Sequence, residues 1–242
     1  MRNTVVAVER FSSYPIGIST NSDGTFRPKQ ASEWGAVNEI RIECQMPNVR
    51  PMRIPGKWRQ GYVLDYHTLR SEFVGHDEFG HPMFDTERTE LGELLYKLKY
   101  GADRSVLQTI VSTVSEFLRS WNPPADAIIP TPPSRASRRF QPVLEIAKGV
   151  SIPLSIPCLE RVLVKRKQTP ELKSVHDYDN RLRILEDVYG IGDATAKGKN
   201  ILLLDDLYRS GATLNAITEL LYSQGEAADV YALALTRTRS VM

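Results

Sequence analysis

The segment that most constrains the fold is ILLLDDLYRSGATL, residues 201–214. Four apolar residues lead into the adjacent carboxylates of Asp205 and Asp206, and an Arg-Ser-Gly-Ala-Thr run follows before a helical pattern begins. A continuous apolar strand of this kind is typical of a parallel sheet that is covered by helices on both faces. The segment therefore predicts a strand, a tight turn and a helix, with polar groups at the carboxyl edge of the sheet, where such sheets bind ligands.

The turn between this strand and helix has the composition of an anion-binding loop. Gly211 has no Cβ and lets the backbone turn tightly around a bulky anion, while the hydroxyls of Ser210 and Thr213 are donors. Backbone amides in the loop and the positive end of the following helix favour a phosphate group. The predicted loop consists of Arg209, Ser210, Gly211, Ala212 and Thr213.

The two aspartates have more than one interpretation. They can accept hydrogen bonds from ribose hydroxyls or hold Mg²⁺, or they can simply cap the next helix. The chain lacks GxGxxG after a strand and lacks GxxxxGK[ST], so a dinucleotide fold and a P-loop nucleoside triphosphatase are not indicated. A phospho-receiver domain needs several further strand–helix units, and only 36 residues follow Asp206.

The rest of the second half of the chain alternates strands and helices. Apolar runs predict strands at 126–130, around 159–164, at 200–206 and at 229–237. Amphipathic patterns predict helices at 86–101, 103–121, 142–149 and 211–225. Gly101 and Gly149 are interpreted as helix ends. This alternation indicates an α/β fold with a parallel sheet flanked by helices.

The first part of the chain has a different, β-rich pattern. Strands are expected at 4–11, 38–45 and 62–66, and a hairpin around Asp-Glu-Phe-Gly is expected within 72–84. We therefore predict a β-rich N-terminal region, residues 1–85, ahead of an α/β domain, residues 86–242.

Composition and charge exclude several classes of protein. With 41% hydrophobic and 25% charged residues, the 242-residue chain is neither fibrous nor wholly disordered. It has no apolar run of the roughly 18–20 residues that a membrane span needs. Two cysteines without CxxC spacing exclude a disulfide framework and a four-cysteine zinc ribbon, and a cytoplasmic location is expected. Residues 131–183 hold 11 Lys/Arg against 5 Asp/Glu, which is typical of a site for a polyanion or of a solvated basic face.

Several segments also resemble a known family. Residues 201–214 are similar to the ribose-phosphate loop of the type I phosphoribosyltransferases, which bind 5-phosphoribosyl 1-pyrophosphate (PRPP), although Arg209 stands where that family commonly has a small residue. The chain resembles the ComF-like subgroup in LLYKLKYGADRSV (94–106), AIIPTPPSRASRRF (127–140) and KRKQTPELKS (165–174). The subgroup's N-terminal zinc ribbon has no counterpart in this sequence.

This resemblance implies a type I phosphoribosyltransferase fold and a Mg²⁺-dependent reaction in which a nitrogen nucleophile displaces pyrophosphate from PRPP. It assigns the 5-phosphate to loop 209–213, and the ribose hydroxyls and Mg²⁺ to Asp205 and Asp206 as catalytic residues. Pyrophosphate is assigned to Thr131, Pro132, Pro133, Ser134 and Arg135, with Arg138 and Arg139 nearby. A lid is expected from Arg166, Lys167 and Lys173, beside Lys165.

The expected partners are PRPP and a nucleobase or other nitrogenous acceptor, with residues 1–85 as a hood that selects it. A homo-oligomer remains open, and a membrane partner is not expected. The alternative is a non-catalytic PRPP- or nucleotide-binding regulator, or a subunit in DNA uptake, DNA processing or phage defence. Direct nucleic-acid binding is less favoured, because the basic residues fall where pyrophosphate would bind. No histidine has zinc-site spacing, and His67 is considered only as a polar group near the acceptor.

Overall fold

The computed structural model describes residues 46–133, 140–167, 185 and 188–239, together with four short strands nearer the N-terminus. The chain divides into two compact units, Met1–Met46 and Pro47–Met242. In the first unit, β1 (Val5–Val6) pairs antiparallel with β4 (Glu43–Cys44), and β2 (Ile18–Thr20) pairs antiparallel with β3 (Phe26–Pro28). All the elements that follow belong to the second unit.

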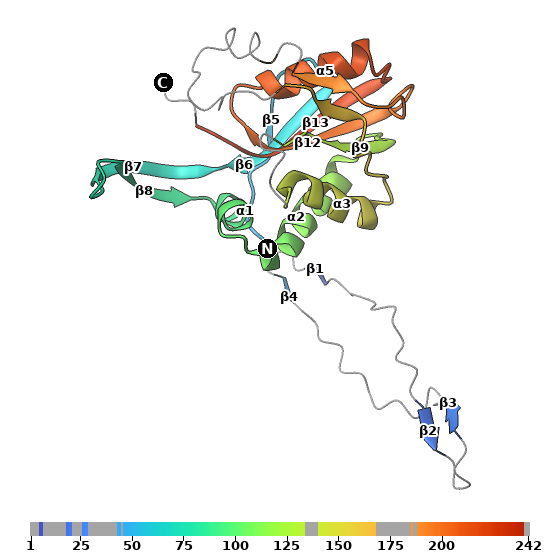
Figure 1. Ribbon diagram of the computed structural model, residues 1–242, viewed down its shortest axis with the longest axis horizontal. Coiled ribbons are helices and arrows are strands. Elements are labelled where there is room, and N and C mark those ends of the chain that lie inside the picture. Colours follow the sequence, from blue (N-terminus) through green and yellow to red (C-terminus); the bar gives the residue numbers. More distant parts are fainter. Residues whose placement is uncertain are drawn as a thin grey trace. The chain divides into compact units, whose positions relative to one another are not determined.

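A five-stranded sheet lies at the centre of the second unit, in the order β5-β6-β13-β12-β9 (Figure 1). Four strands are parallel, and β5 is an antiparallel edge. The strands are β5 (Met52–Arg53), β6 (Gln60–Tyr66), β13 (Asp229–Arg237), β12 (Asn200–Tyr208) and β9 (Ala127–Pro130). The predicted parallel sheet is confirmed by the parallel pairing of β6, β13, β12 and β9. The apolar runs of β9, β12 and β13 lie in its buried interior.

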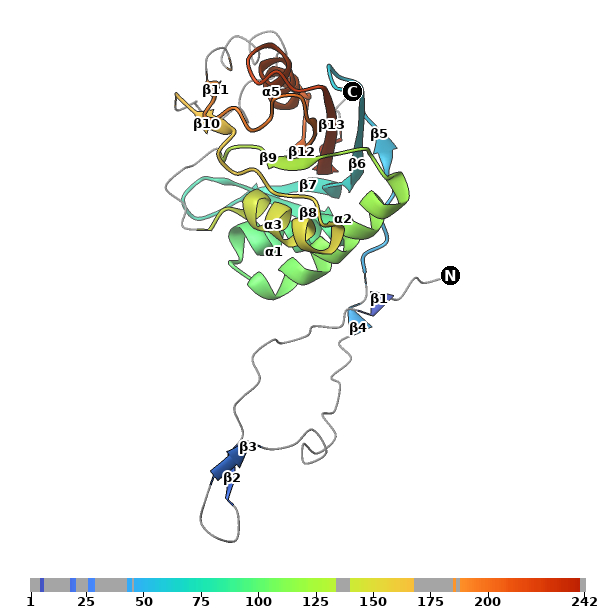
Figure 2. The same ribbon diagram turned by 90° about the vertical axis from the view of Figure 1, so that its right-hand side faces the viewer.

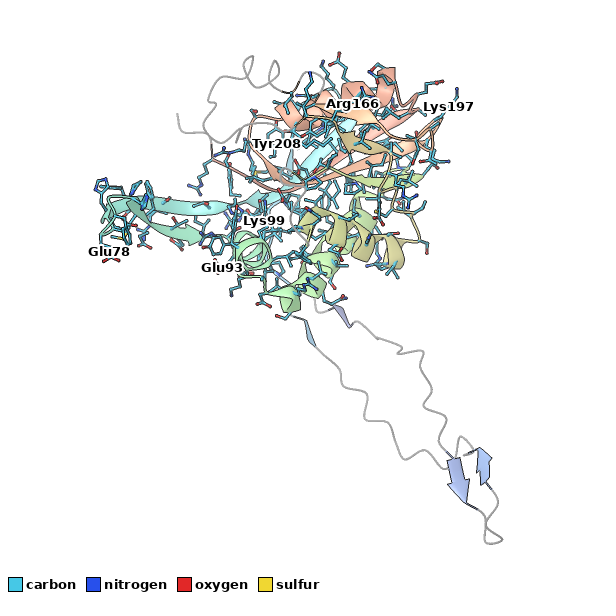
Figure 3. The ribbon with its side chains drawn as sticks, in the orientation of Figure 1. Glu78, Glu93, Lys99, Arg166, Lys197 and Tyr208 are labelled. Carbon is cyan, nitrogen blue, oxygen red and sulfur yellow. The ribbon has the colours of Figure 1, made fainter. Side chains whose placement is uncertain are left out.

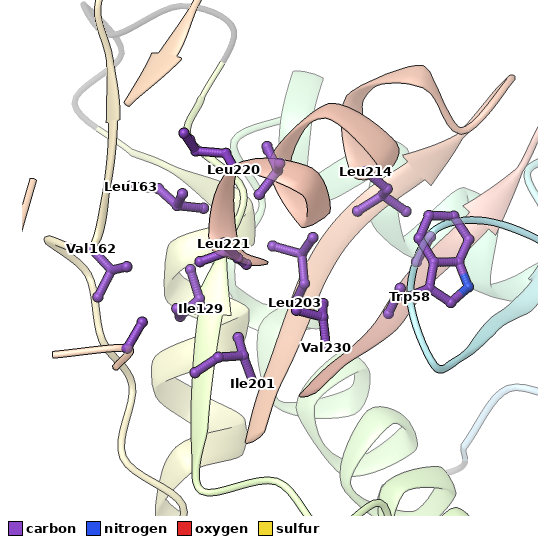
Figure 4. Packing of buried hydrophobic residues seen from close by; sticks show 14 of the residues in the cluster. Trp58, Ile129, Val162, Leu163, Ile201, Leu203, Leu214, Leu220, Leu221 and Val230 are labelled. Carbon is purple, nitrogen blue, oxygen red and sulfur yellow. The ribbon is translucent and has the colours of Figure 1, made fainter. Parts of the chain in front are cut away.

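Helices cover both faces of the sheet (Figure 2). Along β12 the side chains alternate, so that Ile201 and Leu203 pack with α5 (Ala212–Ser223), while Leu202 and Leu204 face the opposite core. Figure 4 shows Leu203 beside Leu214 and Leu221 of α5. The opposite face is covered by α1 (Glu90–Tyr100), α2 (Leu107–Trp121), which follows the short 3₁₀ helix η2 (Arg104–Val106), and α3 (Pro142–Leu154).

Hydrogen bonds at the first turn of helix α1 hold it against the end of β6. The Thr89 hydroxyl caps the helix by accepting from the Gly92 amide at 3.0 Å, and it donates to the Tyr66 carbonyl at 2.6 Å. Gly101 ends the helix, as predicted. A Cβ on Gly92 would overlap the carbonyl oxygen of His67, so this glycine allows the close approach of α1 to the chain that leaves β6.

The expected end of the third helix at Gly149 is wrong. Helix α3 continues through Gly149 to Leu154, and Ser155 ends it in the left-handed conformation. A Cβ on Gly149 would lie 2.5 Å from a methyl group of Val111 in α2. Gly149 therefore allows two helices to pack closely and does not stop one.

The expected domain boundary at residues 85/86 also differs from the observed division after Met46. Strand β6 pairs with β13 from Gln60 to Tyr66, and Val63 and Leu64 are completely buried in the two cores. Residues 60–66 are therefore an integral part of the sheet that residues 127–237 complete. Two further strands outside the central sheet, β10 (Leu163–Lys165) and β11 (Tyr189–Ile191), form an antiparallel pair.

The predicted hairpin is confirmed and is longer than expected. Its strands, β7 (Thr68–His76) and β8 (Pro82–Arg88), form an arm that extends away from the sheet (Figure 1). Phe73 and Phe84 are cross-strand partners with ring centroids 5.8 Å apart, and both are 55% exposed. Strand alternation places the next pair, Glu72 and Asp85, on the other face.

Because the aromatic face of this arm is exposed, polar substitution there is expected to leave the body of the protein intact. Phe73→Ser combined with Phe84→Ser should lower the free energy of unfolding by no more than about 1 kcal/mol, the contribution of one cross-strand pair. Urea unfolding followed by circular dichroism would measure this. A loss of several kcal/mol would show that the arm's aromatic face is buried in solution.

Candidate functional site

The polar residues of β12 lie where its neighbour β9 has ended. Pairing between the two strands stops at Leu204 and Pro130, and the Thr131 amide makes a last contact with the Leu204 carbonyl at 2.9 Å. On its other side β12 pairs with β13 along its whole length, from Asn200 to Tyr208. Asp205 and Asp206 therefore border an open edge of the sheet, at the carboxyl ends of its parallel strands.

Strand alternation separates these two carboxylates. Asp205 follows Leu203 on the α5 face, and Asp206 follows Leu204 on the face that α1, α2 and α3 cover. The sequence expectation treated the pair as one unit at the end of a strand. The structure extends the strand to Tyr208 and gives each carboxylate its own set of partners.

Asp205 is held from two directions. Its Oδ1 accepts from the Thr131 hydroxyl at 2.8 Å and from the Asp206 amide at 2.9 Å. Burial, and then the neighbouring charge of Asp206, raise the pKa of Asp205 to about 7. Asp205 can therefore gain or lose a proton near neutral pH, and a cationic ligand would favour its charged form.

Asp206 forms an ion pair with Lys99 of α1, whose Nζ lies 2.6 Å from Oδ2 of Asp206. Figure 3 labels the position of Lys99. The side chain of Lys99 is only 21% exposed, and that of Asp206 only 16%. Burial alone would lower the pKa of Lys99, but the charge of Asp206 and the hydrogen bond to it have the larger combined effect, and the pKa is raised. Lys99 lies in the LKYG segment and was given no role from the sequence, because its separation of 107 residues from Asp206 hides the pair from any local pattern.

A small cavity of about 40 Å³ adjoins this ion pair and is lined by His67, Leu95, Lys99, Tyr100, Asp206, Leu207 and Thr236. The Thr236 hydroxyl donates to the Asp206 carbonyl at 3.1 Å, and His67 Nδ1 lies 3.2 Å from the same hydroxyl. Burial, and then the charges of Lys99 and Arg88, lower the pKa of His67. A neutral His67 that donates from Nδ1 to Thr236 fits this arrangement, which leaves Nε2 as an acceptor.

The predicted phosphate loop coincides with a tight turn whose glycine has a left-handed backbone. Gly211 has φ 78° and ψ 0°, and α5 begins directly after it. A Cβ at this position would lie 2.9 Å from the Tyr208 ring. The first amides of α5 are thus presented at the end of β12, next to an exposed Arg209.

Tyr189 of β11 contacts the predicted loop and lies near Asp205. Its hydroxyl forms a hydrogen bond with Thr213, and its pKa is raised by burial and by the nearby charge of Asp205. Tyr189 was not among the predicted site residues, because only the packing of β11 against α5 brings it to the loop.

The predicted pyrophosphate and lid residues are described only in part. Thr131 is buried and bonded to Asp205, and Pro132 and Pro133 follow it at the end of β9. Arg166 and Lys167 follow β10, where the Arg166 guanidinium packs against the backbone of Gly190 (Figure 3). Ser134, Arg135, Arg138, Arg139 and Lys173 lie outside the described residues.

A larger cavity of about 280 Å³ lies near the ends of α2 and α3, lined by Leu118, Arg119, Asn122, Pro123, Pro153, Leu154, Ile156 and Leu202. Because α2 ends just before β9 begins, this cavity is at the amino edge of the sheet, away from the phosphate loop. In the described part of the chain, no group of three or more His, Cys, Asp or Glu side chains is arranged for a metal ion. No helix among those residues has the length and apolar character to cross a bilayer.

A scan of protein-family models finds no match. The chain is 28% identical to "Competence protein ComFC" of Bacillus subtilis (strain 168) over 150 residues, which are 60% of this chain and 59% of that protein. It is 27% identical to "Competence protein ComFC" of Streptococcus pneumoniae (strain ATCC BAA-255 / R6) over 158 residues, 65% of this chain and 68% of that protein. The match thus spans about three fifths of the length of the Bacillus relative.

Similar solved structures include phosphoribosyltransferases. Adenine phosphoribosyltransferase from Saccharomyces cerevisiae is 14% identical with a TM-score of 0.38, covering 69% of this chain and 85% of that one. Glutamine PRPP amidotransferase from B. subtilis is 16% identical with a TM-score of 0.43, covering 65% of this chain and 34% of that one. The chain is thus similar in sequence to ComFC proteins over about three fifths of its length, and its parallel sheet flanked by helices agrees with the α/β fold that the sequence predicted.

Proposed function

We propose that this protein binds PRPP and transfers its phosphoribosyl group to a nitrogenous acceptor, with pyrophosphate as the leaving group. The observation that carries the proposal is the left-handed Gly211 at the start of α5, directly after a strand that presents Asp205 and Asp206 at an open sheet edge. A helix N-terminus reached through such a turn is suited to a phosphate group. Carboxylates beside it are suited to the hydroxyls of the attached ribose.

Each part of PRPP then has residues of matching chemistry. Loop 209–213 would hold the 5-phosphate by its amides and hydroxyls. Asp205 would accept from the ribose on the α5 face, and Asp206 on the other face. Bound in this way, both carboxylates would be near the positive charge that develops on the ribose as pyrophosphate leaves, and charge placed for the transition state accelerates the reaction. Residues 131–135 would receive the pyrophosphate, and residues 165–173 would close over it.

Mg²⁺ is the metal ion that this proposal implies. Mg²⁺ usually keeps several waters and uses one or two protein carboxylates together with substrate phosphates. The donor set fits that pattern, since Asp205 is a half-buried carboxylate at the open edge, whereas the Oδ2 of Asp206 already faces Lys99. Asp205 would be the main protein ligand, with Asp206 as a second or indirect one. When bound, the ion would neutralise charge on the pyrophosphate group.

The decisive experiment measures pyrophosphate release from PRPP and Mg²⁺, first alone and then with a panel of nucleobases and nucleotides. Release that requires one acceptor, and that is lost in the double variant Asp205→Asn/Asp206→Asn, would support the transferase and name its acceptor. A protein that neither binds PRPP in calorimetry nor releases pyrophosphate would contradict the proposal.

The raised pKa of Asp205 gives a pH prediction for PRPP binding. If the ionised carboxylate is needed, the affinity for PRPP with Mg²⁺ should rise with pH and level off above about 7, where Asp205 is charged without ligand. Below that pH it should fall by about tenfold per pH unit, as linkage to one proton requires. The titration of PRPP itself affects binding to wild type and to Asp205→Asn in the same way. Calorimetry of both proteins therefore isolates the pH dependence that comes from Asp205. Parallel pH profiles would contradict the role of Asp205.

A second candidate function is PRPP or nucleotide binding without catalysis, as part of competence. The names of the two bacterial relatives favour it. It predicts PRPP binding in calorimetry with no pyrophosphate release for any acceptor, so the same two measurements distinguish it from the transferase.

A further inference from the structure

Asp206 is held by three separate elements of the fold. Lys99 of α1 contacts its carboxylate at 2.6 Å, and Thr236 of β13 donates to its main-chain carbonyl at 3.1 Å. His67, which follows β6, contacts the Thr236 hydroxyl at 3.2 Å. Both the side chain and the main chain of Asp206 are therefore fixed. We call Lys99, Thr236 and His67 the Asp206 clamp.

The position of Lys99 is itself strongly determined. Leu91, Leu95 and Leu98 of α1 are buried in the core at 0–1% exposure, so the helix cannot rotate without exposing them. The first turn of α1 is bonded to Tyr66 through Thr89, close to His67. Burying an ammonium group away from water is costly unless it is paired and hydrogen-bonded. The fold thus brings Lys99 to a place where only a carboxylate such as that of Asp206 makes its burial favourable.

We infer that Lys99 is a positioning residue of the phosphoribosyl site, which holds Asp206 through Oδ2 so that Oδ1 is directed at the ribose. This inference rests on the proposed function. Lys99 is assigned no contact with PRPP, and it acts through Asp206. The ordinary alternative is an ion pair that only joins α1 to the sheet and contributes to stability.

The two roles predict different kinetics. A carboxylate held opposite the developing charge on the ribose stabilises the transition state more than bound PRPP, so loosening it should lower kcat. Ground-state binding of PRPP would come mainly from the phosphate and pyrophosphate loops. A purely structural ion pair would instead change the melting temperature and leave the turnover of the folded protein unchanged.

Lys97→Met is the matched control for Lys99→Met. Lys97 lies on the same helix, is 50% exposed and contacts Glu93 at 3.9 Å, so its removal deletes the same charge from the outer surface of α1. Lys99→Arg is the conservative variant, because a guanidinium keeps the charge and can donate to a carboxylate. Each variant would be compared with wild type in melting temperature, in PRPP affinity by calorimetry, and in kcat for pyrophosphate release.

For Lys99→Met we expect kcat to fall about 10- to 100-fold, as for other residues that orient a site ligand. We expect PRPP affinity to stay within about threefold, Lys99→Arg to recover part of kcat, and Lys97→Met to match wild type. If wild type releases pyrophosphate and Lys99→Met has the same kcat, or loses only melting temperature, the positioning role of Lys99 is overturned and the proposed function is not. A wild type that neither binds PRPP nor releases pyrophosphate would overturn the proposed function, and the clamp with it.

Discussion

Gly211→Ala is expected to lower the affinity for PRPP by about 100-fold, the size of effect that a displacement of about 1 Å can cause in a site. The backbone of Gly211 is left-handed, with φ 78°, which costs an L-residue about 1–2 kcal/mol. The new Cβ would also lie 2.9 Å from the ring of Tyr208. Relief of both strains has to shift the turn, and with it the amides that are proposed to hold the 5-phosphate. Calorimetry with PRPP and Mg²⁺ measures the loss.

Gly198→Ala is the control for this prediction. Gly198 also has a positive φ, 67°, but no atom lies within 4 Å of the position that a Cβ would take. It precedes β12 at the opposite edge of the sheet. The variant should lose about 1–2 kcal/mol of folding stability and keep its affinity for PRPP. Equal affinity in Gly211→Ala and wild type would show that this turn does not bind the ligand.

Gly92→Ala is expected to destabilise the protein by about 3 kcal/mol, the upper end of the usual cost of overpacking. The direction of the stability change is informative, because Gly→Ala in an open helix interior stabilises a protein by about 1 kcal/mol. Here the added methyl group would overlap the His67 carbonyl oxygen, and a main-chain atom cannot move aside as a side chain can. Helix α1 would have to move away from β6, and the contact between Lys99 and Asp206 would be disturbed with it.

Gly149→Ala provides the comparison. Its Cβ would lie 2.5 Å from a side-chain methyl group of Val111, which can adjust by a small shift. We expect a loss of about 1 kcal/mol, at the lower end of the overpacking range. Urea unfolding of both variants would give the two free energies. A gain in stability in Gly92→Ala, or equal losses in the two variants, would contradict the role assigned to the main chain of His67.

The sequence was sufficient for the features that depend on local chemistry and on periodicity. Short apolar runs such as residues 201–204, which alternate along the chain with amphipathic helical patterns, are typical of strands covered on both faces, and they led to the predicted parallel α/β sheet. The glycine in the turn after Tyr208 indicated an anion-binding loop, since few other residues accept a left-handed backbone. The hairpin around residues 77–80 followed from its turn residues in the same way.

Only the tertiary structure decided how distant residues share the site. Gly149 was predicted to end a helix, but it lies inside α3, where the lack of a side chain allows α3 to pack closely on α2. Residues 60–66 looked like part of a separate β-rich region, but their pairing partner is β13, about 170 residues further on. Asp205 and Asp206 are neighbours in sequence, yet strand alternation gives one to Thr131 and the other to Lys99. Local patterns report which conformations a segment favours, whereas the partner of a buried charge is set by the packing of the whole chain.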